Sequence, residues 1–202
     1  MKKRTFALLL CIVSLCSLLL SACGSSDPLV GSWQANIDLS GQIRESLGEN
    51  SQFEIDEFIL PLVYTFNADG TYALSIDEEE YGKSIEKIRQ SFSDSLYKLT
   101  ESLISTLGVE MTVEDYYSLS ETSLEDTVDE MCAGFESLPA EYTQKGTYTA
   151  ADGKLSLTPE GGSADATIFE TYELNGNTLT ILGSSAEDAA QSAFYPLTFT
   201  RK

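Results

Sequence analysis

The residue types that most often carry out catalysis are scarce in this chain. It has no histidine, so the commonest general base and the commonest ligand of transition metals are both missing. Cys132 is the only cysteine after residue 23, and a cysteine nucleophile needs a neighbouring base that histidine cannot supply here. We therefore interpret Cys132 as a small buried apolar side chain, and no disulfide is expected within the domain.

The acidic residues suggest two further kinds of chemistry, metal binding and acid–base catalysis. The segments 77–80 and 125–126 are acidic throughout, but no segment has the spacing of a calcium-binding EF-hand loop, so we interpret both as solvated charge. A glycosidase needs two carboxyl groups that face each other across a cleft, and no spacing marks such a pair. We expect no catalytic residue, no metal and no cofactor, and hence a protein that is not an enzyme.

One acid, Glu170, stands in a pattern of alternating residues. In one phase it shares a face with Ile168, Tyr172 and Leu174, which puts its carboxyl group inside the protein, where a charged group needs a partner such as a tyrosine or a basic side chain. In the other phase Phe169 points inward and Glu170 faces water. The sequence leaves both phases open, and Glu170 is a candidate binding residue only in the first.

Apolar and polar residues alternate in eight segments, a pattern typical of half-buried strands. Turn signals such as 67–70 and 175–177 separate several of them. Eight antiparallel strands joined mostly by hairpins predict a closed up-and-down barrel, with an open sandwich as the alternative. The expected strands are 31–39, 58–66, 71–76, 142–149, 155–158, 167–174, 178–181 and 195–201.

Between the third and fourth strands the apolar period becomes that of a helix. Apolar residues recur at spacings of three and four over 85–107 and again over 124–135. These stripes predict a helical insert at about 82–137, so the fold class is mainly β with a helical insert (α+β).

Local signals predict where these helices start and end. We expect Ser84 to cap the first helix of the insert, Gly108 to end it, and Pro139 to end the last. A short helical turn is expected at 112–115, and a separate short helix at 40–47.

Several motifs near the ends of the domain resemble the lipocalin superfamily in its bacterial lipocalin-like form. That family carries Gly-x-Trp on its first strand, as in Gly31-Ser32-Trp33, and an arginine at its last strand, here Arg201. The phrases at 64–72 and 146–148 also look like hairpins of such domains. The resemblance implies a barrel in which Arg201 packs over Trp33 and closes one end; the helical insert departs from the family pattern.

The resemblance also implies that a small apolar ligand binds within the barrel. The candidate ligand-binding residues are Trp33, Tyr64, Tyr148, Glu170, Tyr172 and Arg201. An eight-stranded barrel is either just filled by side chains or holds one small ligand. The expected inward faces favour a filled barrel because they carry eight aromatic residues, namely Trp33, Tyr64, Phe66, Tyr72, Tyr148, Tyr172, Tyr195 and Phe199.

The N-terminus has the features of an export signal. Positive residues at 2–4 precede an apolar run of about 15 residues, shorter than the roughly 20 of a membrane span. The sequence Leu20-Ser21-Ala22-Cys23 resembles the lipobox of bacterial lipoproteins, which implies cleavage after Ala22 and a lipid on Cys23. The expected organisation is a signal peptide at 1–22, a tether at 23–28, and one lipocalin-like domain at 29–202.

The net charge of the mature chain excludes some classes of binding partner. Removing the signal leaves nine basic and 32 acidic side chains, a net charge of −23. Such a surface repels nucleic acid and anionic membrane faces, so we expect no nucleic-acid partner. We expect the protein to be attached to a bacterial membrane, outside the cytoplasm, through the lipid on Cys23 alone.

Our functional hypothesis is a non-enzymatic envelope accessory module that binds a protein partner through the helical insert. The alternative is a lipocalin-type binding protein for a small apolar ligand. The interior of the barrel discriminates between them, because an apolar cavity of roughly 300 Å³ or more would favour the ligand.

Overall fold

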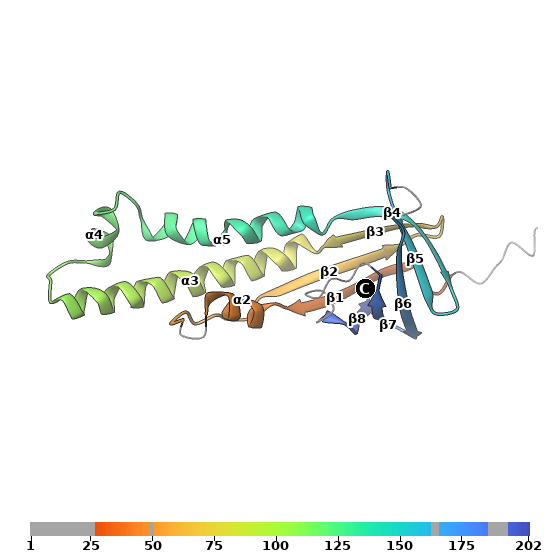
Figure 1. Cartoon of the computed structure of the whole chain (residues 1–202), viewed down its shortest axis with the longest axis horizontal. Helices are drawn as coiled ribbons and strands as arrows, with labels where there is room; N and C mark the ends of the chain where they lie inside the picture. Colours follow the sequence, from red (N-terminus) through yellow and green to blue (C-terminus); the bar gives the residue numbers. More distant parts are fainter. Residues whose placement is uncertain (1–26, 49–50, 163–165, 186–193) are drawn as a thin grey trace, which may run out of the picture.

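The computed structural model of the chain describes residues 27–48, 51–162, 166–185 and 194–202. Eight strands pair antiparallel in chain order, and the last pairs with the first to close a barrel. Helices between the third and fourth strands extend from one end of the barrel as a long arm (Figure 1). The predicted up-and-down barrel with a helical insert is confirmed, and the open sandwich is excluded.

The strands are β1 (Gly31–Asp38), β2 (Ile59–Phe66), β3 (Thr71–Ile76), β4 (Gln144–Ala151), β5 (Lys154–Pro159), β6 (Ile168–Asn175), β7 (Thr178–Ser184) and β8 (Leu197–Arg201). A short helix α2 (Ser40–Leu47) follows β1 as expected. The arm consists of α3 (Glu78–Leu107), α4 (Val113–Ser118) and α5 (Leu124–Glu141). The expected signal peptide and Cys23 lie outside the described residues, as does the tether up to residue 26.

The insert is longer at both ends than the apolar stripes predicted. Helix α3 starts at Glu78 because the side chain of Asp77, and not that of Ser84, caps its first turn by accepting a hydrogen bond from the N–H of Glu80. Gly108 ends α3 in the left-handed conformation as expected. The acidic runs occupy first turns of α3 and α5, where the helix dipole favours negative charge.

Pro139 lies inside α5 instead of ending it, which corrects the expectation. A proline donates no hydrogen bond to the carbonyl four residues before it, which here belongs to Phe135. The hydroxyl of Tyr81 on α3 donates to that carbonyl at 2.7 Å. The helix therefore continues to Glu141, and β4 begins at Gln144 and not at Tyr142.

Buried serines fasten the arm to the barrel. One face of α3 carries three of them, and each accepts a hydrogen bond at 3.1–3.3 Å from a backbone N–H of the segment that leads into β2. Ser84, assigned above to a cap, is one of the three. Buried backbone N–H groups need such acceptors. The serine hydroxyls of α3 therefore satisfy the segment before β2 in the way that the carbonyl groups of a neighbouring strand would. The pairs are Ile59–Ser84, Asp56–Ser91 and Glu54–Ser95.

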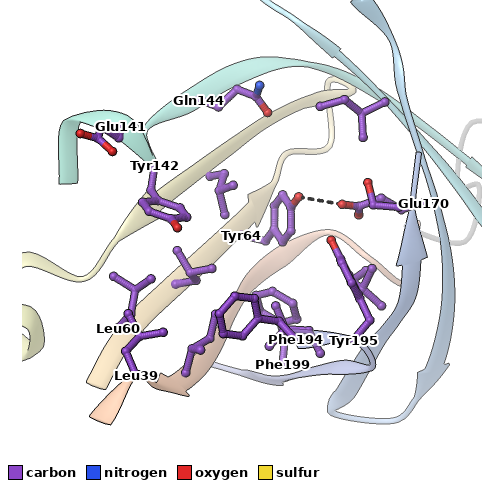
Figure 2. A pocket seen from close by; sticks show the side chains of 17 residues that line it. Leu39, Leu60, Tyr64, Glu141, Tyr142, Gln144, Glu170, Phe194, Tyr195 and Phe199 are labelled. Carbon is purple, nitrogen blue, oxygen red and sulfur yellow. Dashed lines mark hydrogen bonds between the residues drawn. The ribbon is translucent and has the colours of Figure 1, made fainter. Parts of the chain in front are cut away.

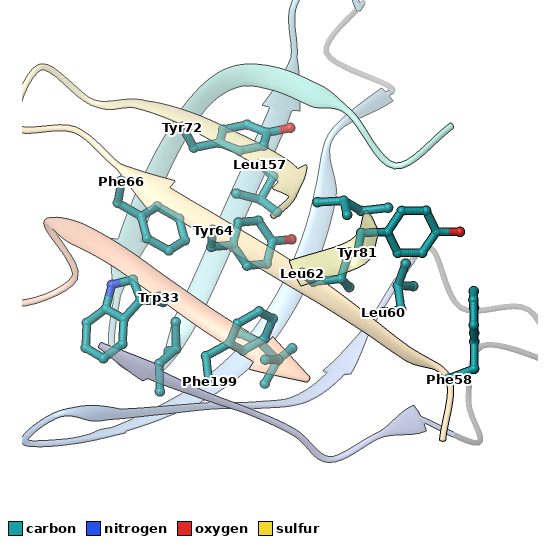
Figure 3. Close-up of a cluster of buried hydrophobic side chains, with 14 of the residues drawn as sticks. Trp33, Phe58, Leu60, Leu62, Tyr64, Phe66, Tyr72, Tyr81, Leu157 and Phe199 are labelled. Carbon is teal, nitrogen blue, oxygen red and sulfur yellow. The ribbon is translucent and has the colours of Figure 1, made fainter. Parts of the chain in front are cut away.

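One hydrophobic core runs from the barrel into the arm (Figure 3). The ring of Phe58, at the entry to β2, contacts Tyr81 and Phe135 of the arm at centroid distances of 5.8 and 5.0 Å. Cys132 is fully buried in this core, and burial raises the pKa of its thiol. It is a small apolar packing residue, as predicted.

Candidate ligand-binding site

One end of the barrel is sealed by the arginine and tryptophan that the lipocalin resemblance singled out. The Arg201 guanidinium lies 4.1 Å from the centre of the buried Trp33 ring. It also donates hydrogen bonds to the carbonyls of Val30 at 2.8 Å and Pro28 at 2.6 Å. The indole N–H of Trp33 donates to the carbonyl of Leu29 at 2.7 Å. The expected packing of Arg201 over Trp33 is confirmed. Both side chains close this end of the barrel, and neither lines the cavity described below.

Two more of the candidate residues belong to the sealed end. The hydroxyl of Tyr148 donates to the Asp27 carboxylate at 3.1 Å, and its ring packs against Phe66 with centroids 4.9 Å apart. The pKa of Tyr172 is raised by burial and then by the nearby carboxylates of Asp27 and Asp152. Neither tyrosine lines the cavity described next.

The opposite end of the barrel, beside the helical arm, contains a cavity of about 320 Å³ (Figure 2). Strands β1, β2, β3, β6, β7 and β8 form its walls, and the α5–β4 junction forms part of its mouth. The prediction that side chains fill the barrel is therefore wrong for this half. Eight leucines and isoleucines and five aromatic residues line this cavity, whereas Trp33, Phe66, Tyr72 and Tyr148 lie outside its lining.

Glu170 lies on the cavity wall and faces inward. It is only 6 % exposed, while its neighbour Phe169 is 58 % exposed, which settles the phase of β6. Its Oε1 accepts a hydrogen bond of 3.3 Å from the hydroxyl of Tyr64, as Figure 2 shows. Its Oε2 is buried and has no hydrogen-bond partner among the described residues. Burial raises the pKa of Glu170 from 4.5 to about 7, against a smaller lowering by the Tyr64 hydrogen bond.

The tyrosines around Glu170 remain neutral donors and acceptors at physiological pH. Burial, and then the charge of Glu170, raises the pKa of Tyr64 well above its ordinary value and that of Tyr72 to about 12. Tyr72 in turn donates to the side-chain amide oxygen of Gln144 at 2.9 Å, and Gln144 lines the cavity.

Of the six candidate residues, the structure brings only Tyr64 and Glu170 together at the cavity. Sequence reasoning missed the residues of the mouth, Glu141, Tyr142 and Gln144. It missed them because Pro139 was expected to end α5, which assigned Tyr142 to a strand. No periodicity signal marks this junction, because the Tyr81 hydroxyl that donates to the Phe135 carbonyl belongs to another helix, far away in the sequence.

Within the described ranges, no three residues among His, Cys, Asp and Glu are grouped so that they could hold a metal ion. In the same part of the chain, no helix combines the length and the apolar character that crossing a membrane requires. Comparisons with protein-family models, with curated proteins and with solved structures found no match.

Proposed function

We propose that this protein is a lipocalin-like binding protein that holds a small, largely apolar molecule in the cavity beside the helical arm. The observation that carries the proposal is the cavity of about 320 Å³, which is at the lower end of the range for ligand pockets. The lipocalin-like assignment is supported by the closed eight-stranded barrel and by Arg201 stacked over Trp33 at its sealed end.

The affinity of a homologous series of ligands tests whether the cavity is used. Each buried methylene contributes ~0.8 kcal/mol, a factor of about four in affinity. We expect straight-chain alcohols to bind with an affinity that rises by this factor per carbon and then stops rising at the length that fills the cavity. Isothermal titration calorimetry on the mature chain, with Cys23→Ser to prevent lipidation, measures the series.

Leu74→Trp should weaken binding of the best alcohol by about tenfold or more. Leu74 is half-buried on the cavity wall, and a larger ring there takes up space that two or more methylenes would occupy, at ~0.8 kcal/mol each. Thr171→Trp is the matched control, because Thr171 is exposed on β6 next to Glu170. Equal affinities in the wild-type chain and the Leu74→Trp chain would contradict the proposed site.

We further propose that the protein is exported and anchored to a bacterial membrane by a lipid on Cys23. The lipobox motif supports this, and the first described residues are compatible with a short tether because Asp27 and Pro28 are bonded to the sealed end. Intact-mass analysis of the protein from membranes of the native host should give a chain that begins at Cys23 and carries a diacylglycerol. A cleaved chain without lipid would rule the anchor out.

A second candidate function, recognition of a protein partner by the insert, is favoured by exposed apolar side chains at the tip of the arm. Leu107 at the end of α3 is 61 % exposed and Leu119 after α4 is 72 % exposed. The cavity nevertheless gives the ligand-binding function the stronger support, because it is a preformed site with a polar group inside it.

A further inference from the structure

The chemistry of the cavity specifies the ligand more closely, on the basis of the function proposed above. We infer that the ligand is a cationic amphiphile, with a positively charged amine that pairs with Glu170 inside the barrel and an apolar body that extends toward the mouth.

The first argument is the unpartnered oxygen of Glu170. Its Oε1 has the Tyr64 hydroxyl as a donor, but its Oε2 is buried without a donor among the described residues. Buried acceptors are almost always hydrogen-bonded in native proteins, and Glu170 is one of the residues that line the cavity. A ligand that brings an N–H group to this place completes the set of hydrogen bonds.

The second argument is the sign of the charge. The charged residues that line the cavity are two acids, Glu170 inside and the exposed Glu141 at the mouth, and no lysine or arginine joins them in the part of the chain that the structure describes. A carboxylate or phosphate would enter without a counter-charge and next to two acids. An ammonium group gains a charge-assisted hydrogen bond, and the net charge of −23 that remains without the signal attracts cations.

The third argument is the arrangement of polar and apolar groups. Glu170 and Tyr64 lie at one side of the cavity, and the aliphatic side chains of residues such as Leu39 and Leu60 lie toward the other (Figure 2). A molecule with one polar end and one long apolar part matches this division. A polar group placed beside Leu39 and Leu60 would be left without a partner.

The pairing also predicts how binding depends on pH. Glu170 faces the hydroxyls of Tyr64, Tyr72 and Tyr195, and the raised pKa values of Tyr64 and Tyr72 keep those two hydroxyls neutral below pH 8. An alkylammonium, like lysine, stays charged throughout this range. Amine affinity should therefore rise from pH 5 to pH 8 as Glu170, whose pKa is about 7, ionises.

Three probes of equal chain length test the inference: n-octylamine, 1-octanol and octanoate, titrated by calorimetry into the mature Cys23→Ser chain at about 0.15 M salt, where surface charge is screened. At pH 8 octylamine should bind about ten- to a hundredfold more tightly than octanol, the gain typical of a hydrogen bond to a charged group. Octanoate should bind most weakly. Glu170→Gln should remove the preference for the amine, so that octylamine and octanol bind with affinities within about twofold of each other.

Glu173→Gln is the matched control, since Glu173 is exposed on the same strand and outside the cavity, and it should keep the preference. Octanol or octanoate binding as tightly as octylamine would overturn the inference but leave the proposed function intact. An equal loss of the preference in both glutamine variants would assign it to surface charge and would also overturn the inference. If none of the three probes binds, the proposed function fails together with it.

Discussion

Glu170→Gln is expected to change the free energy of unfolding in a way that depends on pH. The change at pH 8 should be more stabilising than the change at pH 5 by on the order of 3 kcal/mol. Burial raises the pKa of Glu170 from 4.5 to about 7. Between these values the unfolded chain has lost this proton while the folded chain still holds it, so the free energy of unfolding falls as pH rises. Below pH 4.5 both states are protonated, and above pH 7 the penalty is complete. Glutamine does not titrate and escapes this penalty.

Urea unfolding of the wild type and of Glu170→Gln at pH 5, 6, 7 and 8 measures this effect. The difference in the free energy of unfolding between the two proteins is taken at each pH and then compared between pH values. The packing of the new amide is the same at every pH and cancels, as do all other titrating groups that the two chains share. Glu173→Gln, which changes an exposed carboxylate on the same strand, should show almost no such dependence on pH. A Glu170→Gln effect that is constant from pH 5 to pH 8 would mean that Glu170 titrates normally in the folded protein.

Gly146→Ala should destabilise the protein by about 3 kcal/mol, which lowers the melting temperature by roughly 6–12 °C. A Cβ at Gly146 would lie 2.0 Å from the carbonyl oxygen of Thr158 on the neighbouring strand and 2.8 Å from the ring of Tyr72. The first of these atoms is backbone in a closed barrel, so it cannot move away without shifting β5 against β4. The ring of Tyr72 is itself fully buried.

Gly134→Ala is the matched control, with the opposite sign expected. Gly134 lies inside α5, it is exposed, and a Cβ there would meet no atom within 4 Å. Alanine in a helix is favoured over glycine by ~0.5–1 kcal/mol, so this variant should melt slightly higher than the wild type. If both substitutions left the melting temperature unchanged, the close approach of β4 and β5 would be disproved.

The spacing of apolar residues was enough to predict the barrel and the arm. Apolar residues recur at every second position in the strands and at every third or fourth position in the helices. Periodicity did not determine the phase of β6, because apolar residues stand at both Ile168 and Phe169. The pairing of Glu170 with Ser184 and Leu155 in the closed barrel decides it. Such cross-strand constraints come from residues far away in the chain, which local alternation does not contain.

The cavity was missed for a related reason. The aromatic residues that face inward could be counted from the sequence, but their height along the barrel axis depends on the strand register. Trp33 pairs with Arg201 at the sealed end, where Phe66 and Tyr148 also pack against each other. Tyr64, Tyr195 and Phe199 instead line the cavity beside leucines and isoleucines, where space stays open. A count of bulky residues predicts the volume of a core and not its distribution.

The sealed end and the mouth lie at opposite ends of the barrel, and for the anchored binding protein proposed above this would decide from which side a ligand enters. Residues 27 and 28, four and five positions after Cys23, are hydrogen-bonded to side chains of the sealed end. A copy anchored through Cys23 would therefore turn Trp33 and Arg201 toward the bilayer. A molecule diffusing sideways out of the lipid would meet a closed surface. Loading and release would then take place on the aqueous side, beneath an arm whose 30-residue helix α3 is about 45 Å long.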